Sequence, residues 1–272
     1  MPINDIVLAG GMRADLVQLQ LVSALQARTT ERLATGKRVN SAVDDPSAYF
    51  AAQDHLSHAS DLSARKSDMG EALKGITAAN AGITAITSLI NQAKGLVNSA
   101  RSSNTAARAT LAAQFTAIRG QIDDLAGDSG YKGKNFLSSD NLVVSFNEGG
   151  TSSLTITGFD ASTGAGGLNV ADAVGAWANT TNLTAATTDL DAALVTLRSN
   201  AATLSSNNSV ISSRNDFVTA MVNNLTQGAN DLTAADPNEE SANMLSLQTR
   251  QQLGIATLGL TNQSQQGILR LF

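Results

Sequence analysis

The sequence predicts a mainly α-helical protein with long antiparallel helical rods and one small β-hairpin region. The main observation is an apolar residue at every seventh position over about fifty residues, which keeps one stripe of a helix facing a partner. These positions are Leu183, Leu190, Leu197, Leu204, Ile211, Val218, Leu225 and Leu232. A second rod repeats in the same way at Met69, Ile76, Ile83, Ile90 and Val97, with Ala72, Ala79, Ile86, Ala93 and Ala100 three positions on.

Composition supports helix seams and excludes several classes of function. Hydrophobic residues make up 42% of the 272-residue chain but aromatic residues only 4%, so the core is aliphatic. The net charge of −5 and the absence of basic clusters argue against nucleic-acid binding, which needs grouped Lys and Arg. Cysteine is absent, which excludes disulfides and thiolate metal sites. No signal peptide and no apolar run of about 20 residues is seen, so we expect no membrane span.

Cap signals divide the chain into helices. The first helix is expected from Asn4 to Ala34, with Gly36 as a left-handed cap. Asp45-Pro46 and Asp236-Pro237 each place an N-cap before a proline at the first helical position, and so predict two further helix starts. A shorter helix is expected over 105–126, ended by Gly127 and Gly130.

The segment between the rods is different in composition. Residues 131–182 are rich in Gly, Ser, Thr and Asn. Two β-like runs, 142–146 and 153–157, flank the turn-forming residues 147–150 and predict a hairpin.

Catalytic and metal-binding patterns are missing from the sequence. His55 and His58, with Asp54 and Asp61 nearby, could share a helix face, but their spacing is not that of a helical zinc motif. We interpret them as a solvated face, and we expect no cofactor, no metal and no enzymatic activity. Asn200 and Asn207 fall at the second seam position, where they either fix the register or face water.

Both terminal helices are poor in charge and apolar on more than one face, which indicates many neighbours. Head-to-tail repetition of such contacts would give an open helical polymer. An ordinary intramolecular bundle with its ends tucked inside is the alternative.

Four short motifs stand near the two ends of the chain: ERLATGKRVNSA at 31–42 followed by Asp44-Asp45, VNNLT at 222–226, QQLG at 251–254 and QQGILRLF at 265–272. Together they resemble motifs of the bacterial flagellins. The resemblance covers both ends of the chain and frames the two rods.

The resemblance implies an architecture and a role. Residues 1–40 and 237–272 would form a terminal coiled-coil core domain, 45–130 and 183–235 a helical rod domain, and 131–182 a hairpin and surface-loop insertion without large outer domains. Copies would polymerise into the extracellular flagellar filament used for swimming, after export without a cleaved signal peptide. Other flagellin subunits, hook-associated proteins, cap proteins and a cytoplasmic export chaperone would be the partners.

Two sets of residues are predicted to carry this role. The polymerisation interface is expected at Leu8, Met12, Leu16, Leu19, Leu253, Leu258, Leu260, Ile268, Leu269, Leu271 and Phe272. The rod seam is expected at the two heptad series, from Met69 to Val97 and from Leu183 to Leu225. The rival interpretations are a hook–filament junction protein, or a coiled-coil surface adhesin that binds glycans.

Overall fold

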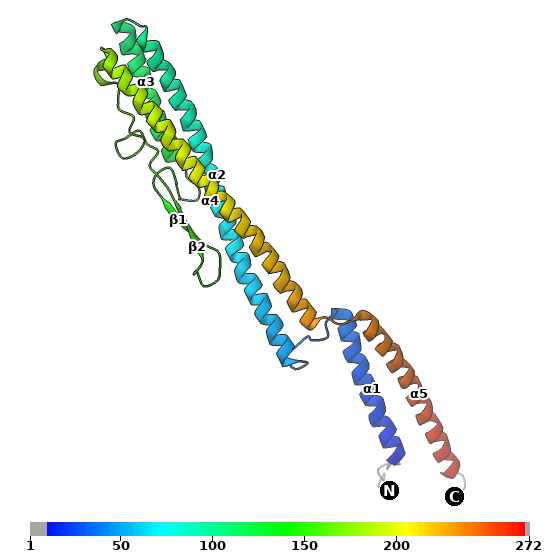
Figure 1. Cartoon of the computed structure of the whole chain (residues 1–272). Helices are drawn as coiled ribbons and strands as arrows, with labels where there is room; N and C mark the ends of the chain where they lie inside the picture. The colour runs from blue at the N-terminus through cyan, green and yellow to red at the C-terminus, as the bar shows by residue number, and fades with distance from the viewer. Residues whose placement is uncertain (1–9, 270–272) are drawn as a thin grey trace, which may run out of the picture. The chain divides into compact units, whose positions relative to one another are not determined.

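The computed structural model describes residues 10–269, except for the side chains of 265 and 267–269. The chain divides into two compact units, one of residues 1–57 with 224–272 and the other of residues 58–223. The described residues form five long helices and one two-stranded sheet, which confirms the mainly α prediction (Figure 1). The finer three-part division expected from the sequence stays a prediction.

The element bounds follow the cap signals closely. The elements are α1 (Gly10–Thr35), α2 (Pro46–Arg101), α3 (Thr105–Asp128), β1 (Asn141–Ser145), β2 (Ser153–Thr157), the 3₁₀ turn η1 (Val174–Trp177), α4 (Thr180–Thr233) and α5 (Pro237–Leu269). Both Asp-Pro pairs begin helices as predicted. The Asp45 carboxylate accepts the Ala48 N–H at 3.0 Å, and the Asp236 carboxylate accepts the Asn238 N–H at 2.8 Å.

Helices α2 and α4 run antiparallel within the unit of residues 58–223. The pairing is visible in cross-helix contacts whose residue numbers change in opposite directions. Arg101 donates to the Thr187 hydroxyl at 3.1 Å, Lys94 pairs with Asp191, and the Asn215 side chain donates to the Lys66 carbonyl at 3.3 Å. Side chains between these contacts therefore meet in one fixed register.

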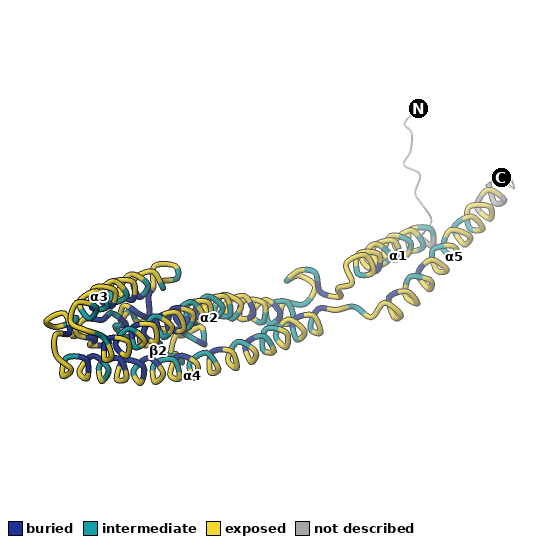
Figure 2. Tube along the Cα trace, turned by 90° about the horizontal axis from the view of Figure 1, so that it is seen from above, coloured by how far each residue is buried: buried dark blue, intermediate teal, exposed yellow. Residues whose placement is uncertain are grey.

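The predicted seam residues in this unit lie in its core. All five members from Met69 to Val97, the Ala and Ile positions offset by three, and the α4 series from Leu183 to Val218 are buried. Figure 2 shows the buried positions of α4 recurring along the helix between exposed ones. Leu225 and Leu232 belong to the other unit and are half-buried. Asn200 and Asn207 are also half-buried, and the Asn200 side chain donates to the Thr196 carbonyl of its own helix.

Among the described residues, helix α2 is long and apolar enough, by length and composition alone, to cross a membrane. The sequence analysis expected no such run, so this differs from the expectation. Ile76, Ile83, Ile86 and Ile90 of this helix are buried in the protein core.

Helix α3 is joined to the core by aromatic contact. Phe115 and Trp177 are fully buried, and their rings meet edge to face with centroids 5.0 Å apart. The helix continues to Asp128, past the Gly127 expected to end it. The buried Asn135 side chain donates to the Ala126 and Gly127 carbonyls at 2.7 and 2.9 Å, which satisfies the open end of the helix.

The predicted hairpin is present, with each β1 residue paired to one of β2 from Asn141↔Thr157 to Ser145↔Ser153. Val144 and Ile156 point into the core. At the turn, the side-chain oxygen of Asn147 accepts a hydrogen bond from the Ser152 N–H at 3.1 Å. Gly150 has a φ of +66°. This left-handed conformation explains the need for glycine in the turn.

A carboxylate on α2 anchors the loop that precedes the hairpin. Glu71 accepts a hydrogen bond from the Tyr131 hydroxyl at 2.8 Å and pairs with Lys132 at 2.9 Å and Lys74 at 3.1 Å. These hydrogen bonds, first that of Lys132, then those of Tyr131 and Lys74, lower the pKa of Glu71 from 4.5 to about 2.

Gly82 of α2 lies where no larger side chain fits. A Cβ there would be 2.7 Å from Leu137 Cδ1 and 2.8 Å from Ser129 Cβ. We expect Gly82→Ala to destabilise the protein by about 1–3 kcal/mol, because a buried backbone segment has to move. Gly95→Ala is the matched control, since nothing lies within 4 Å of its Cβ. Urea unfolding should show a neutral or stabilising effect for the control, and equal loss in both variants would contradict the packing argument.

The lowered pKa of Glu71 predicts a pH dependence. The contact stabilises the fold fully above the ordinary pKa of 4.5, and this contribution is lost as the pH falls toward about 2. The Glu71→Gln variant should therefore lose less stability than the parent chain over that window. Thermal unfolding at intervals of pH measures the difference, and parallel curves for the two proteins would rule the linkage out.

Candidate assembly surface

Helices α1 and α5 lie side by side and antiparallel in the unit formed by the two ends of the chain (Figure 1). Leu19 packs over Gly254, where an added Cβ would lie 3.2 Å from its Cδ1 atom. Val22 and Thr29 of α1 and Leu247 of α5 are buried between the helices. Each helix thus buries one narrow stripe.

A buried ion pair fixes the register of the two helices. Arg32 Nη1 of α1 lies 2.9 Å from Glu240 Oε1 of α5. The Glu240 side chain is only 7% exposed, so its charge depends on Arg32 for compensation. The sequence analysis did not single out this pair. No local signal marks it, because the two residues are 208 positions apart and each has charged neighbours in sequence, Glu31 beside Arg32 and Glu239 beside Glu240.

The chain between α1 and α2 forms a tight turn built on two aspartates. The Asp44 carboxylate accepts the N–H groups of Asn40 and Ser41 at 3.2 and 3.1 Å and the Ser41 hydroxyl at 3.1 Å. The Ser41 hydroxyl, followed by the Ser41 and Asn40 N–H groups, holds the pKa of Asp44 below its usual value. Asp45 caps α2, so the two adjacent carboxylates bind different segments: Asp44 binds the turn before it, and Asp45 binds the first turn of the helix after it.

The same turn is hydrogen-bonded to the segment between α4 and α5. Arg38 N–H donates to the Thr233 carbonyl at 2.7 Å, and Ala235 N–H donates to the Gly36 carbonyl at 3.0 Å. Gly36 has a φ of +67°, as the predicted left-handed cap requires. We call these two segments, 36–45 and 233–236, the clamp. The clamp joins the end of α1 to the start of α5.

Half of the predicted interface residues whose side chains are described are exposed on this helix pair. Leu16, Leu253 and Leu260 are exposed, whereas Met12, Leu19 and Leu258 are half-buried. Leu8, Leu271 and Phe272 lie outside the described residues, as do the side chains of Ile268 and Leu269. These positions therefore stay a prediction as an interface.

Further apolar side chains are exposed on the same two helices. They are Val17, Leu21, Leu25 and Leu33 on α1, and Leu245 and Ile255 on α5. Two hollows of about 280 and 250 Å³ run along the pair, the first beside Arg32 and Glu240 and the second beside Leu253 and Gly254. These hollows are open to solvent beside the seam, so the pair by itself does not form a closed core.

Comparison with known proteins assigns both ends of the chain. Residues 4–141 match the model of the bacterial flagellin N-terminal helical region, and residues 187–272 match that of the C-terminal helical region. The chain belongs to the bacterial flagellin family. Only residues 142–186 lie between the two matched flagellin regions, which leaves no room for a large outer domain.

A flagellin from Bacillus cereus has a solved structure similar to this chain, with 14% identity and a TM-score of 0.47. The alignment covers 56% of this chain and 88% of the other. The family assignment rests on the two sequence matches, and this likeness adds no weight to it. No curated protein gave a significant match to the chain.

The flagellin-like motif at 31–45 now has a physical explanation. Arg32 pairs with Glu240, Gly36 supplies the left-handed cap, Asp44 closes the turn and Asp45 begins α2. Val39 is buried beneath them. The residues of this motif therefore have structural roles in the pairing of α1 with α5, in the clamp and at the start of α2.

The histidines show no metal site. His58 Nδ1 lies 2.8 Å from Glu148 of the hairpin turn, in the unit of residues 58–223. His55 belongs to the other unit, where a Cβ added at Gly228 would lie 3.7 Å from its Cδ2 atom. Within residues 10–269, no group of three His, Asp or Glu side chains is placed to hold a metal ion.

Removal of the buried anion should loosen the helix pair. We expect Glu240→Ala to destabilise the pairing of α1 and α5 by about 1–3 kcal/mol, because Arg32 loses its partner while it stays partly buried. Glu239→Ala, at an exposed neighbouring position, is the control. Hydrogen exchange of the amides of α1 and α5 measures the effect locally. Unchanged exchange in Glu240→Ala would show that the pair does not hold the register.

Proposed function

We propose that this chain is the structural subunit of an extracellular bacterial flagellar filament, and that its terminal helices drive self-assembly. The observation that supports this most is the exposed apolar surface of α1 and α5, next to a seam that buries only one stripe of each helix. Membership of the flagellin family supports the same role.

The energetics favour burial of this surface among copies. Apolar area removed from water contributes about 25 cal/mol per Å², so each fully buried leucine is worth about 1.5–3 kcal/mol. Leu16, Leu21, Leu253 and Leu260 expose this kind of area in one molecule. A helix from a neighbouring subunit can cover it, and the same contact then recurs on the next subunit and leads to an open polymer.

The remaining roles follow from this proposal. The unit of residues 58–223 would supply the rod-to-rod contacts around the filament core, with no catalytic step and no cofactor. The filament would serve swimming motility. Hook-associated proteins, cap proteins and a cytoplasmic export chaperone would be its further partners.

Two substitutions on α5 test the proposal. Leu253→Ser combined with Leu260→Ser should abolish filament formation by purified protein, because both exposed side chains would lose their apolar contact. The helical content of the monomer should not change. Val174→Ser in the turn η1 is the control, since Val174 is 60% exposed and lies on the insertion, outside the rod helices α2 and α4 and the terminal helices α1 and α5. Electron microscopy and sedimentation of concentrated samples give the readout.

Each rival predicts a different result. A hook–filament junction protein would stay monomeric alone and join only unlike partners. A coiled-coil adhesin would remain a monomer or closed oligomer and bind a glycan saturably. Normal filaments from the double variant, or none from the parent chain, would refute the proposed role of the terminal helices.

A further inference from the structure

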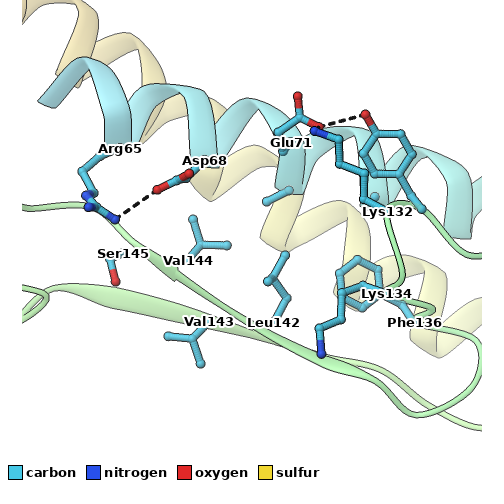
Figure 3. Close-up of a pocket in the computed structure, with 13 residues that line it drawn as sticks. Arg65, Asp68, Glu71, Lys132, Lys134, Phe136, Leu142, Val143, Val144 and Ser145 are labelled. Atoms are coloured by element: carbon cyan, nitrogen blue, oxygen red, sulfur yellow. Dashed lines mark hydrogen bonds and ion pairs between the residues drawn. The ribbon is translucent and has the colours of Figure 1, made fainter. Parts of the chain in front are cut away.

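A groove of about 280 Å³ lies between helix α2 and strand β1, within the unit of residues 58–223 (Figure 3). Its apolar lining comes from Phe136 beside Gly75 and from Leu142 and Val144 of β1. The ring of Phe136 would lie 3.2 Å from a Cβ at Gly75, so the absence of a side chain there keeps the ring close to the helix. The groove is separate from the surface of α1 and α5.

The free edge of β1 borders this groove. The Phe146 N–H donates to the Ser152 carbonyl, and the Gly158 N–H donates to the Asp140 carbonyl. Because antiparallel pairing alternates, the even-numbered residues of β1 bond to β2, and the backbone groups of Val143 and Ser145 point away from it.

Four consecutive β1 residues line the groove and no β2 residue does, which places the free edge at its side. No backbone partner for Val143 or Ser145 is found within residues 10–269. An open edge of this kind is a template for another strand.

The charges at the rim are unequal. Three cations, Arg65, Lys132 and Lys134, face two anions, Asp68 and Glu71. Asp68 pairs with Arg65 at 3.0 Å, and Glu71 is held by Lys132, as described above. Lys134 has no ion-pair partner in the described part of the chain, and the buried Arg65 Nε has no hydrogen-bond acceptor there. The rim therefore has one more cation than it has anions, and one buried donor without an acceptor.

We propose that this groove binds an extended segment of a partner protein that pairs with β1 and carries alternating apolar and acidic side chains. The backbone of the segment supplies acceptors and donors to Val143 and Ser145. Its apolar side chains meet the half-buried Leu142, and its carboxylates face Lys134. Strand addition of this kind combines main-chain affinity with side-chain specificity.

A capped, fluorescently labelled heptapeptide in which valine alternates with glutamate is the probe. Its binding to the full chain is followed by fluorescence anisotropy, at protein concentrations where sedimentation shows a monomer. The same peptide with lysine in place of glutamate, and one with N-methylated valines, are the ligand controls. We expect saturable binding for the glutamate peptide alone.

Two variants locate the site. Val143→Pro removes one N–H from the free edge and should weaken binding about tenfold. Thr155→Pro is its matched control, because the N–H of Thr155 faces away from β1 on the opposite edge. Lys134→Glu reverses an exposed charge without touching the strand and should weaken binding about fivefold. Circular dichroism checks that each variant keeps its helical content.

The outcomes decide the proposal even if the proline variant misfolds. Equal binding of the lysine and glutamate peptides, or binding unaffected by Lys134→Glu, would overturn it. So would equal losses in Val143→Pro and Thr155→Pro. Self-association of the parent chain without peptide, abolished by Val143→Pro alone, would show that a second copy occupies the edge and would refute the assignment to a partner protein.

Discussion

Two helices that pair alone can each bury only one stripe of side chains, and every other apolar group on them stays in water. The unit formed by the chain ends is subject to this limit. Val22, Thr29 and Leu247 fill the seam, whereas Leu16, Leu253 and Leu260 remain outside it. No repacking of two helices removes this surplus, because a third neighbour is needed to cover it. The assembly role proposed for this flagellin rests on that exposed apolar surface.

The helices of the unit of residues 58–223 bury more than one stripe of side chains, because further elements pack against them. Its two antiparallel helices are joined by α3 and by an insertion that adds Phe136, Leu137 and Trp177 to the core. The heptad series of α2 and α4 are buried there almost without exception. One chain thus contains a closed helical core and an incomplete one, although both have similar aliphatic composition.

Much of this arrangement was predictable, because it depends on local or periodic signals. The heptad spacing identified the long helices, the Asp-Pro pairs marked two helix starts, and the glycines after Asn147 marked the hairpin turn. Contacts between residues far apart in sequence were not predictable. Arg32 and Glu240 are 208 positions apart, and no local pattern links them.

The same reason explains the smaller misses. Helix α3 extends past Gly127, where it was expected to end, because the side chain of Asn135 donates hydrogen bonds to its last carbonyl groups. The turn η1 places Ala176 and Trp177 at positive φ, which no propensity would suggest. The buried contact of Trp177 with Phe115 compensates for that strained backbone. Tertiary contact overrides local preference at each of these positions.

The clamp gives the terminal helices a fixed common origin. Since the end of α1 and the start of α5 are already hydrogen-bonded to each other, bringing the two helices together requires almost no loop to be closed. Their pairing can then proceed like a zipper from the Arg32–Glu240 ion pair outward. Opening the pair from its far end should cost least, because the hydrogen bonds of the clamp hold the other end together.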